Sequence, residues 1–112
     1  MAIKRGPDGV PLYARKKDAN HDIIAYGFVF NGWKWYDTYK FGSGFGDGIA
    51  VLESGQTKLV VVVEIKTAKG RPTKAEKKFK REYPGYYEVV RTEDQVKMLT
   101  RYYRRLLAEV KR

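Results

Sequence analysis

Among its 112 residues the chain has no cysteine, a single histidine and no long apolar run. Without cysteine there can be no disulfide framework, no thiolate zinc site and no cysteine nucleophile. No stretch approaches the roughly 20 apolar residues that span a bilayer, and the first residues lack the apolar core of a signal peptide. Because His21 is the only histidine, a histidine cluster is excluded. We expect His21 to cap a helix or to lie at the surface. These absences predict a soluble intracellular protein with no membrane partner.

Positive charge is what the chain has in excess, with 23 Lys and Arg against 13 Asp and Glu and a formal net charge of +10. Such an excess repels itself in a folded protein, so a polyanionic partner is the natural explanation. Nucleic acid is the leading candidate. An anionic membrane surface is a weaker one, because the bases are interleaved with structure-forming positions. We expect one domain over residues 1–112, with residues 1–17 as a flexible basic arm.

The periodicity of apolar side chains predicts an α/β fold. Strands are expected over 33–41, 49–53, 59–65 and 86–91, and helices over 74–83 and from 93 onward. A capping box at Thr92 and Gln95 opens the last helix, whose apolar stripe is Val96, Leu99, Tyr103, Leu106 and Val110. We expect Trp33, Trp35 and Tyr36 to pack in the core rather than stack on bases.

The segment over 19–31 is ambiguous from its local pattern. Ile23, Ile24 and Phe28 lie at helical spacing, and Asp18 could cap a helix that begins at Ala19. The β-formers between residues 26 and 30, followed by Asn31-Gly32, favour a hairpin instead. The local pattern slightly favours the hairpin.

A tight turn at Gly55-Gln56 would gather three charged side chains on one face of a hairpin. Pairing residues outward from this turn places Asp47 directly across from Glu64, with Cβ atoms about 4.5–5.5 Å apart. Lys66 follows two residues after Glu64 and therefore emerges on the same face. Two opposed carboxylates repel unless a cation lies between them. Lys66 could be that cation, and so could a divalent metal such as Mg²⁺ or Mn²⁺.

This constellation has the chemistry of a phosphodiesterase site. A divalent metal on the carboxylates would acidify a bound water and stabilise the charge of the reacting phosphate. Lys66 would hold the water or neutralise the phosphate oxygens. The alternative is a solvated ion pair, since a Glu and a Lys two apart often form one at a strand end.

A basic run follows the triplet directly. We interpret it as a phosphate-binding surface beside the scissile bond, and the alternative is an ordinary solvated helix face. The candidate DNA contacts are Lys69, Arg71, Lys74, Lys77, Lys78 and Arg81.

Asp47 with Glu64-Ile65-Lys66 resembles the signature of the PD-(D/E)XK nuclease superfamily. From about residue 15 to residue 96 the chain is similar to its VRR-NUC group (virus-type replication-repair nucleases), especially to small phage-borne members. The most specific part is the Thr-Ala-Lys-Gly-Arg segment over 67–71, followed by a basic helix. The resemblance implies an α/β core with a mixed central sheet flanked by helices, and a helix over 19–31.

Site residues follow from the same resemblance. Asp47 and Glu64 would bind the metal together with the backbone carbonyl of Ile65, and Lys66 would be the catalytic lysine. Glu76 stands near the site, where the family usually has a glutamine. The implied protein is a Mg²⁺- or Mn²⁺-dependent DNA endonuclease, a homodimer acting on branched DNA such as four-way junctions. It would work in the cytoplasm of a prokaryotic or phage-infected cell.

Two further departures from the family pattern bear on activity. Gly46 replaces the proline that usually precedes the aspartate, which loosens the backbone but removes no ligand. Ile23 stands where the family commonly has an acidic residue, which would weaken catalysis. Two other functions therefore remain open: a catalytically weak or inactive DNA-binding module with the nuclease fold, and a purely structural basic protein that binds any duplex.

Overall fold

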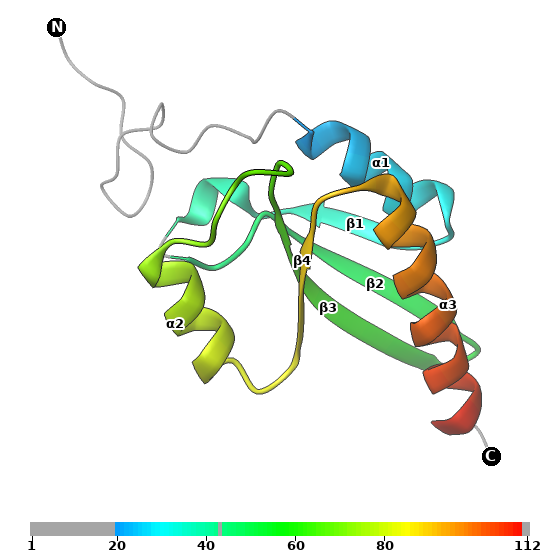
Figure 1. The fold of residues 1–112 in the computed structure, drawn as a ribbon. Helices are drawn as coiled ribbons and strands as arrows, with labels where there is room; N and C mark the ends of the chain where they lie inside the picture. Colours follow the sequence, from blue (N-terminus) through cyan, green and yellow to red (C-terminus); the bar gives the residue numbers. More distant parts are fainter. Residues whose placement is uncertain (1–19, 43, 111–112) are drawn as a thin grey trace, which may run out of the picture.

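The computed structural model describes residues 20–42 and 44–110, and a mixed four-stranded sheet forms its centre (Figure 1). Its strands follow one another in chain order: β1 (Lys34–Asp37), β2 (Gly48–Ser54), β3 (Thr57–Ile65) and β4 (Tyr86–Val90). The first three are antiparallel neighbours, whereas β3 and β4 run parallel. The predicted α/β class with a mixed central sheet is confirmed. The predicted arm over 1–17 lies outside the described residues.

The two faces of this sheet are covered differently (Figure 1). One face packs against α1 (His21–Phe30) and α3 (Glu93–Val110), and its core includes Ala50, Val61, Phe28 and Tyr103. The opposite face, which carries the alternate residues of each strand, is covered in part by α2 (Lys74–Glu82). Phe79 of α2 lies 5.9 Å from the ring of Tyr87 on β4. None of the described helices is both long and apolar enough to cross a membrane.

The hairpin register of β2 and β3 agrees with the prediction. Ser54 pairs with Thr57 around the turn, and the pairing continues to Gly48 opposite Val63. Gly55 has φ +62°, a left-handed conformation that glycine adopts at no steric cost. Burial of β3 on both faces is complete only toward its end, because Val60 is 44% exposed whereas residues 61–65 are all buried.

The ambiguous segment is a helix, so the hairpin that local propensity favoured is wrong. Ile24 and Phe28, four residues apart, are each 1% exposed in the core beneath α3. This tertiary burial outweighs the β-forming residues of the segment. Asn31 and Gly32 end the helix instead of turning a hairpin: the Asn31 amide donates to Gly27 O, and Gly32 has φ +95°.

The predicted strand over 33–41 is too long at both ends. Trp33 lies before β1 and is 3% exposed in the core, and Trp35 packs against that core, as expected. The prediction for Tyr36 is wrong, because its side chain is 55% exposed. The strand ends at Asp37 because its partner β2 begins opposite it, at Gly48. The N–H of Thr38 then donates to Asp47 O, and the chain turns into the short 3₁₀ helix η2 (Tyr39–Phe41).

Helix α3 begins with the predicted capping box, since Thr92 and Gln95 exchange side chain to backbone hydrogen bonds. Val96 and Tyr103 are buried, and Leu99 and Leu106 are partly buried against the core. The prediction for Val110 is wrong, because its side chain is 64% exposed at the end of the helix. The buried stripe instead includes Thr100 and Leu107, which complete a period of about 3.6 residues.

Candidate active site

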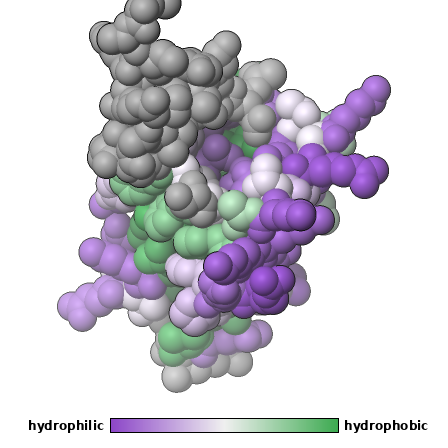
Figure 2. Space-filling view, turned by 90° about the vertical axis from the view of Figure 1, so that its left-hand side faces the viewer, coloured by the Kyte–Doolittle hydropathy of each residue, from purple (hydrophilic) through white to green (hydrophobic). Residues whose placement is uncertain are grey.

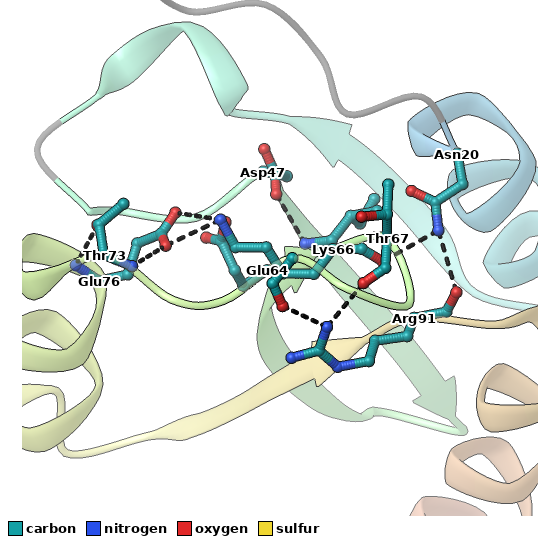
Figure 3. Close-up of polar contacts among 10 residues, drawn as sticks. Asn20, Asp47, Glu64, Lys66, Thr67, Thr73, Glu76 and Arg91 are labelled. Carbon is teal, nitrogen blue, oxygen red and sulfur yellow. Dashed lines mark hydrogen bonds and ion pairs between the residues drawn. The ribbon is translucent and has the colours of Figure 1, made fainter.

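Asp47 is fixed at the start of β2 by hydrogen bonds to the neighbouring strand (Figure 3). Its N–H donates to Val63 O at 2.8 Å, and its Oδ2 accepts from the N–H of Ile65 at 2.7 Å. The regular pairing of β2 with β3 ends one residue earlier, at Gly48 opposite Val63. Asp47 therefore lies beside the end of β3, but its hydrogen bonds are to the backbone of Val63 and Ile65, and a direct pairing with Glu64 stays a prediction.

The chain reaches Asp47 through a loop that only glycine can form at two places. Gly46 has φ +120°, whereas a proline ring holds φ near −65°. A Cβ on Gly44 would lie 2.4 Å from the carbonyl oxygen of Ala75 in α2. The loop is thus seated directly on the first turn of α2, and a proline at position 46 would require a different approach to Asp47.

Lys66 lies between two carboxylates (Figure 3). Its Nζ is 3.5 Å from Glu64 Oε1 and 3.0 Å from Glu76 Oε1, and all three side chains are largely buried. Glu64 emerges from β3, and Lys66 follows directly after that strand. The structure therefore brings the predicted residues Asp47, Glu64, Lys66 and Glu76 to one place.

Glu76 reaches this place because of how α2 begins. Thr73 and Glu76 form a capping box, in which the N–H of Thr73 donates to Glu76 Oε1 and the N–H of Glu76 donates to Thr73 Oγ1. Such a box satisfies two backbone donors of the first helical turn. The same carboxylate accepts from Lys66 Nζ at 3.2 Å. Helix capping and the charge network of the site thus share one side chain.

Burial, followed by a hydrogen bond with Glu76 and the negative charge of Asp47, raises the pKa of Glu64 to about 10, and Lys66 offsets this only in part. Burial also acts to raise the pKa of Glu76, but hydrogen bonds from Glu64, the Thr73 backbone and Lys66 lower it below its ordinary value. At neutral pH and without a further cation, Glu64 thus holds a proton and Glu76 is ionised.

Tyr87 was not predicted as a site residue, although its hydroxyl lies beside these carboxylates. Burial, followed by the negative charges of Glu64, Glu76 and Asp47, raises the pKa of this phenol. The sequence of β4 alone does not indicate that Tyr87 lies at the site. The register of β4 supplies it, because Tyr87 pairs with Val62 and so shares a face with Glu64.

A small cavity of about 70 Å³ opens at the carboxylates and is lined by Asp47, Glu64, Glu76, Tyr39, Phe45 and the glycines at 42, 44 and 46. Carboxylate oxygens are the ligands that Mg²⁺ and Mn²⁺ prefer. A bound cation would also offset the negative charges of Asp47 and Glu76, which help to keep Glu64 protonated, so the residues present fit such a metal. Within residues 20–42 and 44–110, no group of three acidic or histidine side chains is close enough together to hold a metal ion by itself. The Ile65 carbonyl stays a predicted ligand.

The turn after Lys66 is held by two residues that were not predicted (Figure 3). Arg91 Nη1 donates to the carbonyl oxygens of Thr67 and Gly70. Asn20 donates to the carbonyl oxygens of Lys66, at 3.1 Å, and Arg91, at 3.0 Å. Asn20 is 46 and 71 residues away from these acceptors in the chain. No local pattern could have indicated this clamp.

All six predicted DNA contacts are exposed, but they do not form one surface with the cavity. Lys69 and Arg71 lie in the loop between β3 and α2. The other four, at i, i+3, i+4 and i+7 along α2, lie on the side of the helix opposite Glu76. Figure 2, which looks onto the side with α2, shows hydrophilic side chains gathered beside a central hydrophobic area. The outward stripe consists of Lys74, Lys77, Lys78 and Arg81.

His21 does not lie at the surface and does not cap a helix, so that expectation is wrong. It is 1% exposed, and its Nε2 lies 2.9 Å from Asp37 Oδ1. The first turn of α1 covers the end of β1 here, and the ring also packs edge-on against Tyr39 at 5.3 Å. Ile23, in contrast, is 54% exposed and does not line the cavity.

Comparisons of the chain with protein-family models, curated proteins and solved structures found no match.

Proposed function

We propose that the chain is a Mg²⁺- or Mn²⁺-dependent DNA endonuclease of the PD-(D/E)XK superfamily, similar to its VRR-NUC group. The observation that supports this most directly is the convergence of Asp47, Glu64 and Glu76 on one cavity. Lys66 forms ion pairs with Glu64 and with Glu76 at this cavity. A metal ion held by such carboxylates can activate water and stabilise the charge of a reacting phosphate, and Lys66 adds a second positive charge beside them.

Each side chain has a distinct role in this proposal. Asp47 and Glu64 would hold the cation, with the Ile65 carbonyl completing the protein ligands. The cation supplies Lewis acidity when bound. Lys66 would donate to a phosphate oxygen or hold the attacking water when a cation replaces its contact with Glu64. Glu76 keeps Lys66 oriented through their 3.0 Å ion pair.

DNA is the proposed partner because the chain carries a net charge of +10 and exposes Lys69 and Arg71 in the loop that follows Lys66. Lys69 and Arg71 lie in the loop between β3 and α2, shortly after Lys66, and are the first candidates for contact with the DNA strand that is cut. One site cuts one strand, so cleavage of branched DNA such as a four-way junction would need a homodimer. Sedimentation equilibrium across protein concentrations tests that state.

The test is cleavage of labelled duplex, single-stranded and four-way-junction DNA with Mg²⁺ or Mn²⁺. The variants are Glu64→Ala and Lys66→Ala, with Glu82→Ala as the matched control because Glu82 is exposed at the end of α2. We expect metal-dependent cleavage that both site variants abolish and the control retains. Cleavage that persists in Glu64→Ala, or that needs no metal, would rule the site out.

A DNA-binding module without catalysis is the second candidate. Ile23 favours it, because this exposed side chain stands where the family commonly has an acid and contributes nothing to the cavity. This candidate predicts that the parent chain and the Asp47→Ala variant bind DNA equally well without metal, and that neither cuts it.

A further inference from the structure

Phe41 is an exposed aromatic side chain beside the carboxylate cavity. It is the last residue of η2 and is 59% exposed. The next residue, Gly42, lines the cavity, and so does Phe45, whose ring centroid lies 5.6 Å from that of Phe41. Single exposed apolar residues are common and carry no meaning alone. The position of this one, at the rim of the proposed cleavage site, gives it significance.

The ring of Phe41 is held in place by neighbouring aromatic rings. Phe45 packs edge-on against Phe41, and its ring centroid also lies 5.2 Å from that of Phe79 on α2. The backbone is held as well, since the N–H of Phe41 donates to Thr38 O and Thr38 donates from its own N–H to Asp47 O. Figure 2 shows hydrophobic surface at the centre of this side of the molecule. Phe41, Phe45 and Phe79 thus form an aromatic row, which is anchored on α2 at Phe79 and exposed at Phe41.

An open aromatic face next to a phosphate-cutting site suits one kind of ligand. Bases inside an intact duplex are stacked on one another, whereas an unpaired base exposes a π-face that stacks on an aromatic side chain. Lys40, also exposed, directly precedes Phe41 and adds positive charge for the backbone of the same strand.

We propose that Phe41 is a base-stacking platform that selects DNA with an unpaired nucleotide next to the scissile phosphate. This inference rests on the proposed nuclease function for the chemistry at the phosphate, but the stacking itself requires no cleavage. Phe41 is thus a specificity-determining residue, and intact duplex is the disfavoured substrate.

The test measures binding without cleavage, in chelator and without added metal. The probes are a single strand and a matched duplex, each carrying the fluorescent base 2-aminopurine. The variants are Phe41→Ala, Phe41→Leu, which keeps an apolar contact with Phe45, and Phe41→Trp, which keeps an aromatic face. Phe30→Ala is the matched control, because Phe30 is 75% exposed but lies on α1, on the other side of the sheet.

We expect Phe41→Ala and Phe41→Leu to weaken single-strand binding by about 5- to 150-fold, the range typical of one lost stacking contact. The 2-aminopurine signal of stacking should disappear, whereas duplex binding and the salt dependence should change little. Phe41→Trp should restore both affinity and signal, and Phe30→Ala should behave as the parent.

Equal losses on single strand and duplex, or no loss in Phe41→Leu, would overturn the platform. A parent chain that binds and stacks unpaired bases but cuts nothing with either metal would overturn the nuclease proposal while leaving the platform standing. Metal-dependent cleavage with unchanged single-strand preference in Phe41→Ala would do the reverse.

Discussion

Glu64 links the stability of the metal-free protein to pH. The folded chain holds its proton up to about pH 10, whereas an unperturbed glutamate loses it near 4.5. Between these values the folded state binds more protons than the unfolded state, so stability is full at low pH and falls as pH rises. The neutral isostere in Glu64→Gln should remove this dependence and raise stability at alkaline pH.

The expected gain is about 1 kcal/mol or more, which corresponds to a rise in Tm of at least roughly 4 °C. It is measured by thermal unfolding in chelator from about pH 6 to about pH 9. Glu82→Gln serves as the control at an exposed position. A parallel pH dependence in the parent chain and Glu64→Gln would mean that Glu64 is not the titrating group.

At the scale of elements, α2 depends on a side chain that the site also uses. Thr73→Ala removes one half of the capping box and should cost about 1 kcal/mol of stability. Glu76→Gln keeps an oxygen for the Thr73 N–H but removes a negative charge from the cavity. We therefore expect Glu76→Gln to fold normally and to bind Mn²⁺ more weakly, by about tenfold.

Calorimetric titration of Mn²⁺ into both variants separates these effects. Thr73→Ala should lower Tm with little change in metal affinity, and Glu76→Gln should do the opposite. Undiminished metal affinity in Glu76→Gln would place its carboxylate outside the metal's field.

The turn between β3 and α2 depends on the clamp by Arg91. Arg91→Lys keeps the charge but replaces the planar guanidinium, which reaches two carbonyl oxygens here, with a single ammonium. We expect faster hydrogen exchange of the amides in residues 67–70 and a ten- to about hundredfold loss of cleavage through misplacement of Lys66. Arg101→Lys, exposed on α3, is the control. Unchanged exchange in residues 67–70 would show that the turn holds itself.

Local pattern was sufficient for the elements whose signals are local. The turn at Gly55-Gln56, the capping box at Thr92 and the apolar run of β3 each follow from adjacent residues, and the pairing of β2 with β3 as far as Gly48 and Val63 follows from the turn. The length of β1 was not accessible, because it is set by where β2 begins. The clamp by Asn20 and Arg91 was not accessible either, because it joins segments that are far apart in the chain.

At the scale of the whole molecule, the net charge of +10 predicts strongly salt-dependent binding to DNA. Lys69 and Arg71 lie in the loop after β3. The basic stripe on α2, in contrast, faces away from Glu76. We therefore expect Lys69→Gln with Arg71→Gln to lower cleavage and to reduce the slope of log K against log salt by about 1–2. Lys77→Gln with Lys78→Gln removes the same charge and should have a smaller effect on cleavage.

Filter binding over a range of salt concentrations and cleavage by both double variants test this difference. Equal effects of the two pairs would indicate that the DNA path includes the outer face of α2. A larger effect of the α2 pair would move the scissile strand away from the loop.

The placement of the two tryptophans gives the molecule a built-in optical asymmetry. Trp33 donates from Nε1 to Thr100 on α3, and Trp35 stacks on Phe28 of α1 at 5.3 Å. On the opposite face, the ring contacts that α2 and the aromatic row make within residues 20–42 and 44–110 are between phenylalanine and tyrosine side chains. Tryptophan emission therefore reports on the packing of the sheet against α1 and α3, and not on its packing against α2. The Phe41→Trp variant would add a tryptophan on the side of α2, so that the difference between its emission and that of the parent chain reports on this layer.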